Sequence, residues 1–173
     1  GLLTVQLLRA AGCKVLAADI NETRVELAER FGARAIKTGG NINTVEFCCN
    51  ATGGVGVDGV LIATASSSNT TISEAANACR QRGRIVLVGT SGLDLNRSDF
   101  YKKEITLQIS SSYGPGRYDQ KYEIDGQDYP IGYVRWTAQR NFEAILAALE
   151  NGSLDVKPMI THRFGVERAL DAY

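Results

Sequence analysis

Short apolar runs alternate along the chain with segments that carry the apolar spacing and end signals of helices. The apolar runs have strand length and occupy residues 14–19, 33–37, 57–64, 84–90 and 104–112. The segments of helical character occupy residues 1–12, 22–31, 43–50, 70–82 and 137–150. Successive strands joined by helices pair in parallel through right-handed crossovers. The pattern therefore predicts an α/β fold built on a doubly wound, mostly parallel sheet.

Polar residues and glycines predict where these helices begin and end. Asn21 is a favourable N-cap for the helix at 22–31, and Gly32 is expected to end it. Gly83 is expected to end the helix at 70–82.

The composition changes at Tyr113. Five of the seven tyrosines lie between Tyr113 and Tyr133, together with two prolines and several glycines. We therefore expect three parts: a sheet domain over 1–112, an ordered Tyr- and Gly-rich loop over 113–135, and a C-terminal helix with a return segment of the same domain over 136–173.

One acidic residue ends the first apolar strand. Gly1 opens a helix, a strand follows, and Asp19 closes it eighteen positions after Gly1. This order matches the second half of the Rossmann dinucleotide fingerprint, whose carboxylate, about 20 residues after the glycines, binds the adenosine ribose. A carboxylate there disfavours the 2′-phosphate of NADP, so NAD is the expected cofactor and NADP the less favoured one. The strand and the two glycines that begin the fingerprint are not in this sequence, so we expect a Rossmann sheet whose first strand is missing from the chain, as in an N-terminally truncated fragment.

Charge and cysteine spacing exclude several classes. Nineteen basic and nineteen acidic residues leave no net charge, which gives no support to nucleic acid or an anionic membrane as partner. No apolar run approaches the roughly 20 residues that span a bilayer. The four cysteines (Cys13, Cys48, Cys49 and Cys79) lack metal-site spacing, so we expect buried, reduced thiols in a cytoplasmic protein and no metal ligand. No paired carboxylates or nucleophile–base motif predicts a catalytic residue.

Several short segments resemble a known family. KVLAADINETRVELAERFGA, GVGVDGVLIAT, GRIVLVGT, FYKKEITLQ and LDVKPMITHRF are similar to the nucleotide-binding domain of medium-chain, zinc-type alcohol dehydrogenases. SYGPGRYD and YPIGYVRWTAQRN resemble the bi-domain oxidoreductases of that family more specifically. The resemblance implies hydride transfer between NAD and a small hydroxyl or carbonyl substrate. Zinc and the proton-relay groups belong to a separate catalytic domain in this family, so the chain alone is expected to be inactive.

The resemblance also implies cofactor contacts. Gly1, Leu2 and Leu3 would face the pyrophosphate at a helix N-terminus. Asp19 would hold the adenine ribose. The remaining contacts would lie beside the adenine and its ribose (Ile20, Asn21 and Arg24), over the cofactor (Thr64 and Ala65), at the nicotinamide end (Val88, Gly89 and Thr90), and near the carboxamide (Ile109 and Ser111).

Two other functions remain open on sequence grounds. A regulatory module could sense NAD without catalysis. An S-adenosylmethionine methyltransferase also uses a glycine-rich turn and an acid after its second strand, but such folds end in an antiparallel strand, which the loop after Ser112 disfavours.

The strand at 104–112 is expected at the edge of the sheet. It alternates apolar with polar residues and contains no proline, so it is a template for pairing and for a homodimer, as in the resembled family. Without the first strand, the strands at 14–19 and 58–64 would face each other across a gap. We expect these two strands to close up and pair directly, or to be joined by an extended segment of this or a neighbouring chain.

Overall fold

The computed structural model of the chain describes residues 1–39 and 42–173. Its strands are β1 (Leu16–Asp19), β2 (Arg34–Lys37), β3 (Val57–Ile62), β4 (Cys79–Leu87) and β5 (Thr106–Ile109). Its α-helices are α1 (Leu2–Ala10), α2 (Glu22–Arg30), α3 (Thr44–Ala51), α4 (Thr70–Ala78), α5 (Arg97–Tyr101), α6 (Gln120–Glu123) and α7 (Ala138–Glu150). Two 3₁₀ segments follow, η1 (Lys157–Met159) and η2 (Val166–Ala172).

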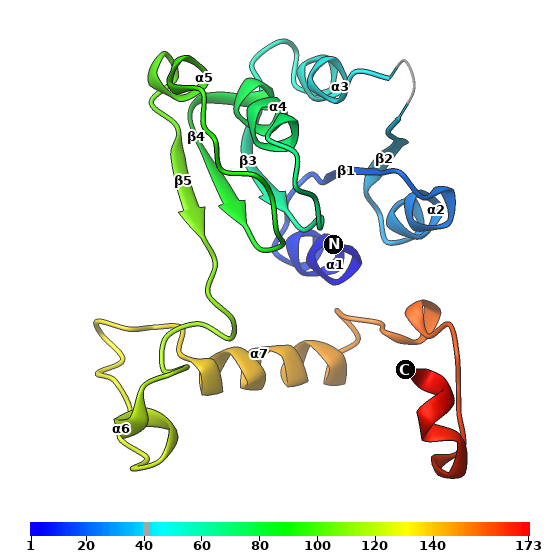
Figure 1. Ribbon diagram of the computed structural model, residues 1–173, viewed down its shortest axis with the longest axis vertical. Coiled ribbons are helices and arrows are strands. Elements are labelled where there is room, and N and C mark those ends of the chain that lie inside the picture. Colours follow the sequence, from blue (N-terminus) through cyan, green and yellow to red (C-terminus); the bar gives the residue numbers. More distant parts are fainter. Residues whose placement is uncertain (40–41) are drawn as a thin grey trace.

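All strand pairs are parallel, and helices connect the strands, which confirms the predicted α/β class. The strands β1 and β2 form one sheet, with Asp19 opposite Lys37, and β3, β4 and β5 form a second sheet in that order. These are the two halves that a Rossmann sheet leaves on either side of its first strand. In Figure 1 the arrowheads of β3, β4 and β5 point toward the side on which α7 lies.

The expected closing of the gap between the two halves is wrong for this chain, since the halves do not pair directly and no strand of the described residues joins them. Within residues 1–39 and 42–173, β1 pairs with β2 only, and β3 pairs with β4 only. Each half buries its own apolar cluster. The smaller cluster gathers Val5, Ala28 and Ala33, and the larger one gathers Ile62, Ile72, Ala75, Ala76, Cys79, Ile85 and Leu87. Because the apolar side chains of each half pack within that half, side-chain burial does not require the main chains of β1 and β3 to meet.

Helix ends are set largely as the polar residues predict. Asn21 caps α2 through its side chain, which accepts from the backbone N–H of Arg24, and Gly32 follows the helix at φ +88°. Asn43 and Thr137 cap α3 and α7 in the same way. Each cap joins residues that are close together in the sequence, so these helix ends can be predicted from the sequence.

The boundary between α4 and β4 differs from the expectation. The helix ends at Ala78 rather than near Arg82, and the strand begins at Cys79, whose backbone is extended and pairs with Val57. The Lys103 ammonium explains this early end, because it donates to the carbonyls of Ala76, Asn77 and Cys79. Strand β5 is also shorter than expected, since Glu104 and Ser112 adopt positive φ on either side of it.

The C-terminal segment returns to α1. The buried Gln6 amide donates to the Asp155 carbonyl at 3.0 Å and accepts from the Asp155 N–H at 2.7 Å, and the neighbouring Leu154 is buried. This two-point bond joins residues 149 positions apart. It fixes the far end of α7 to the first half of the sheet. No helix in the described part of the chain is long and apolar enough to cross a membrane.

Candidate nucleotide-binding site

The acidic residue at the end of β1 lies within a small polar cluster. The Asn21 N–H donates to Asp19 Oδ1 at 2.9 Å, and Arg24 Nη1 lies 3.9 Å from Asp19 Oδ2. Because Asn21 also caps α2, one short turn holds the carboxylate and brings the guanidinium beside it. Ile20 stands 75% exposed in the same turn. The structure therefore brings together the four residues predicted for the adenine half.

No side chain caps the N-terminus of α1. Gly1 occupies the N-cap position, and a Cβ added to it would meet no atom within 4 Å. Leu2 and Leu3 form the first turn, where backbone N–H groups have no carbonyl of a preceding turn to reach. Such a turn favours an anion through its free donors and its dipole.

A second cluster joins the ends of β3 and β4. The Thr90 N–H donates to the Thr64 carbonyl at 2.9 Å, and the Ser66 N–H donates to the Thr90 carbonyl at 3.0 Å. Ala65 and Thr90 form an isolated parallel bridge. Gly89 fits only without a side chain, because a Cβ there would lie 2.0 Å from the Thr64 carbonyl oxygen. The two loops are thus joined through their main chains.

The remaining predicted residues lie beside this second cluster. Val88 follows the end of β4, and Ile109 is the last residue of the neighbouring β5. Each is 53% exposed. The Ser110 N–H donates to the Leu87 carbonyl at 2.9 Å, which continues the ladder just before Ser111. No hydrogen bond or ion pair between described residues connects this second cluster to Asp19. The predicted site is therefore two clusters, one on each half of the sheet.

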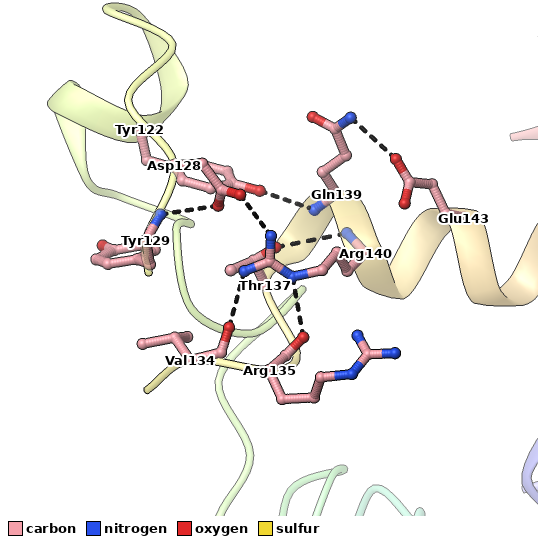
Figure 2. Close-up of polar contacts among 9 residues, drawn as sticks. All are labelled: Tyr122, Asp128, Tyr129, Val134, Arg135, Thr137, Gln139, Arg140 and Glu143. Atoms are coloured by element: carbon pink, nitrogen blue, oxygen red, sulfur yellow. Dashed lines mark hydrogen bonds and ion pairs between the residues drawn. The ribbon is translucent and has the colours of Figure 1, made fainter. Parts of the chain in front are cut away.

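Polar contacts tie the tyrosine-rich segment to itself and to α7. Figure 2 shows the Arg140 guanidinium reaching back from α7 to the Asp128 carboxylate and to the carbonyls of Val134 and Arg135. The Arg140 side chain is 14% exposed, whereas that of Asp128 is 54% exposed, so only the guanidinium side of this contact is shielded from solvent. Thr137, which caps α7, is fully buried beside it. No sequence motif predicts this cluster, because its partners lie on a loop without periodicity.

Two further pairs of side chains hold the same segment, and both shift the pKa values of their members. The Tyr129 hydroxyl donates to the Asp119 carboxylate, which lowers the pKa of Asp119 and raises the pKa of Tyr129. The Arg117 guanidinium donates to Glu123 and lowers the pKa of that carboxyl. These contacts hold α6 and its flanking turns in place. They favour a structural role for the segment over a catalytic one.

Metal-binding side chains do not converge in this structure. Among residues 1–39 and 42–173, no three His, Cys, Asp or Glu side chains gather as a metal site. All four cysteines are free thiols. Cys48 and Cys79 are buried, as expected, and burial raises the pKa of both thiols, but Cys13 is exposed because it follows the end of α1. The described residues therefore do not fit a zinc ion.

Comparison with known proteins identifies a family. The family model described as zinc-binding dehydrogenase matches residues 1–124. A zinc-type alcohol dehydrogenase-like protein of Escherichia coli (strain K12), YdjJ, is 27% identical over all of this chain and 43% of its own length. An NAD-dependent alcohol dehydrogenase of Saccharolobus solfataricus is 28% identical over 99% of this chain and 42% of its own length. The crystal structure of the alcohol dehydrogenase TADH from Thermus sp. ATN1 superposes with a TM-score of 0.75 at 23% identity, over 99% of this chain and 43% of that one. The chain thus spans less than half the length of these relatives.

Proposed function

The chain belongs to the zinc-binding dehydrogenase family, and we propose that it is the NAD-binding domain of a medium-chain alcohol dehydrogenase-like oxidoreductase. In the whole protein, hydride would pass between the nicotinamide and a small substrate that carries a hydroxyl or carbonyl group. This domain would supply cofactor position and electrostatics. The Asp19 cluster carries the proposal, because a carboxylate held by a turn at the end of a parallel strand is the arrangement that binds an adenosine ribose. Membership of a dehydrogenase family sets the methyltransferase alternative aside.

The cofactor would lie along the ends of the strands, where ligands of open α/β sheets bind. Gly1, Leu2 and Leu3 would receive the pyrophosphate. Asp19 would accept hydrogen bonds from the adenine ribose, with Ile20, Asn21 and Arg24 around it. The second cluster would receive the nicotinamide half through Thr64, Ala65, Val88, Gly89, Thr90, Ile109 and Ser111. The exposed faces of Val88 and Ile109 support this assignment, since a flat ring needs apolar surface.

We expect NAD to be preferred over NADP. Asp19 would repel a 2′-phosphate, whereas Arg24, 3.9 Å away, would attract one. The Asn21 N–H holds the Asp19 carboxylate in place, whereas the Arg24 side chain is 63% exposed and its charge is screened by solvent, so the repulsion by Asp19 should dominate. Removing the carboxylate would leave the guanidinium free to pair with the phosphate.

A titration of the whole protein with NAD and NADP tests this function. Wild type should bind NAD more tightly, and Asp19→Ala should lose most of that preference. Glu22→Ala is the matched control, because it removes a nearby carboxylate that pairs instead with Lys37 at 3.1 Å. Equal or tighter NADP binding by wild type would refute the assignment of Asp19.

The domain boundaries and the assembly are part of the proposal. We assign residues 1–112 to the cofactor-binding core, 113–135 to the bound appendage, and 136–173 to a helix and return segment of the same domain, supported by the Gln6–Asp155 bond. Strand β5 lies at the edge of its sheet, so we propose a homodimer in which two β5 strands pair. A cytoplasmic location fits the free cysteines. We expect neither nucleic acid nor membrane as a partner, because the net charge is zero.

Catalytic groups and zinc are assigned to residues outside this chain. The purified 173-residue chain should contain no stoichiometric zinc and should not reduce NAD with an alcohol. Elemental analysis that finds one zinc per chain would overturn this assignment. A whole protein that binds NAD but oxidises no alcohol would instead support an NAD-sensing module.

A further inference from the structure

An asparagine outside the predicted site holds the loop of the second cluster. Asn69 occupies the N-cap position of α4, where an asparagine side chain ordinarily accepts from a backbone N–H of the first turn. Here the side chain makes no such bond. Its Oδ1 instead accepts from the N–H of Asp94 at 3.1 Å, 25 residues further along the chain.

The contact between Asn69 and this loop is close. A Cβ added to Gly92 would lie 2.1 Å from Asn69 Oδ1 and 2.8 Å from the Ser67 carbonyl oxygen, so only glycine fits there. The Gly92 N–H donates to the Ser68 carbonyl at 3.3 Å, and the Ser91 hydroxyl donates to the same carbonyl at 3.1 Å. These bonds hold the loop after β4 against the turn that precedes α4.

The loop held in this way begins at the residues assigned to the nicotinamide. The N–H groups of Val88 and Gly89 both donate to the Ile62 carbonyl at 2.9 Å, and Thr90 pairs with Thr64. The main chain from 88 to 90 is therefore fixed by β3 and by the residues that follow it. Residues 91 and 92 are held by the Ser68 carbonyl, and Asn69 holds the loop further along, at Asp94. Without the Asn69 side chain, the bonds to Ile62, Thr64 and Ser68 would remain. The loop would lose its hydrogen bond at Asp94 and its close contact at Gly92, and could shift there.

We propose that Asn69 is a positioning residue for the nicotinamide half of the cofactor. It acts by fixing Gly92 and Asp94, in the loop that continues from residues 88–90, and touches neither the adenine half nor the reacting atoms. This inference rests on the proposed function. It assigns Asn69 and Gly92 a role that the family resemblance did not give them.

Binding of two ligands to the whole protein separates this role from a general structural one. ADP-ribose carries the adenine half and the pyrophosphate of NAD and lacks the nicotinamide. Asn69→Ala should weaken NAD binding about tenfold, as expected for one lost hydrogen bond that orders a site, and should leave ADP-ribose affinity unchanged. Gly92→Ala should act in the same direction, because its methyl group displaces the Asn69 side chain.

Two variants serve as controls. Asn69→Asp keeps an oxygen for the Asp94 N–H and should retain the NAD affinity of wild type. Asn77→Ala removes an asparagine of the same helix that donates only to the Ser73 carbonyl, and it should change neither affinity.

The outcomes separate the positioning role of Asn69 from the proposed function of the domain. If Asn69→Ala lowers the affinity for NAD and for ADP-ribose equally, or lowers neither, the positioning role is overturned and the proposed function is left intact. Wild type that binds ADP-ribose as tightly as NAD would also overturn it, because the loop would then hold no nicotinamide. Wild type that binds neither ligand would refute the proposed function and this inference with it.

Discussion

At the scale of single residues, buried amides contribute more than exposed ones. The Gln6 side chain is buried and satisfies both the N–H and the carbonyl of Asp155. Gln6→Ala would leave both groups without their partner, so we expect unfolding to become easier by about 1–3 kcal/mol. Gln139→Ala is the control, because Gln139 is exposed and donates to Glu143 within one helix. Chemical denaturation of the two variants checks this, and equal stability losses would contradict it.

Single residues also differ in whether their contacts can be predicted from the sequence. The Asp19–Asn21–Arg24 cluster could be predicted because all its members lie within six residues, where capping and strand ends are local signals. Asn69 and Arg140 could not be predicted. The Asn69 partner is 25 residues away, and the Arg140 partners lie on an aperiodic loop.

At the scale of elements, a lysine sets the boundary between α4 and β4. The Lys103 ammonium donates to three carbonyls at the end of α4, at 3.2, 2.7 and 2.8 Å. Lys103→Met keeps the aliphatic stem but removes these bonds, so we expect a loss of about 1–3 kcal/mol of stability. Lys102→Met should have little effect, because the Lys102 side chain makes no hydrogen bond or ion pair with the described residues and only its main-chain carbonyl accepts from a side chain, that of Gln81. Thermal unfolding followed by circular dichroism compares the two variants.

The same example explains the limits of sequence prediction for elements. Apolar spacing placed all five strands, and caps placed α2 and α7 within a residue or two. The apolar spacing predicts too long a helix at 70–82, since the residue that ends it, Lys103, lies far along the chain in the turn between α5 and β5. Strand β5 was predicted too long because positive φ at Glu104 and Ser112 is not encoded by glycine.

The appendage at 113–135 should respond to acid. The pKa values of Asp119 and Glu123 are lowered in the folded chain, so their contribution to stability is present above the ordinary carboxyl pKa and is lost as pH falls through the lower, folded values. We therefore expect the segment to detach below about pH 4. Trp136, the only tryptophan, lies between this segment and α7, so its fluorescence should report the change.

Two variants sharpen the acid prediction. Asp119→Asn should weaken the segment already at neutral pH and reduce the acid-dependent change, whereas Asp125→Asn should titrate like wild type. Fluorescence that stays flat to pH 3, or that changes only together with the far-ultraviolet circular dichroism of the whole chain, would contradict it.

At the scale of the whole molecule, the edge strand decides assembly. The Ser110 N–H donates toward β4, so by alternation the N–H of Gln108 faces β4 and that of Leu107 faces the open edge. Leu107→Pro would remove an outward donor, and we expect monomers where wild type forms dimers. Gln108→Ala, which leaves the main chain intact, should remain dimeric. Sedimentation of wild type as a monomer at tens of micromolar, a rough threshold for micromolar affinity, would contradict the proposal.

The two halves of the sheet also belong to this scale. Each half folds around its own apolar cluster, and the candidate site is divided between them. A dinucleotide has two halves of its own, so one cofactor molecule that reaches both clusters would link the halves of the sheet. We therefore predict a cofactor footprint with two separate parts.

Hydrogen exchange of the whole protein with and without NAD tests this most directly, because it reports backbone protection along the chain. We predict that NAD slows exchange in two separate regions, residues 19–24 and residues 64–69 with 88–92, and leaves residues 157–173 unchanged. Protection in only one region, in neither, or mainly in residues 157–173 would contradict the assignment of this chain as an NAD-binding domain.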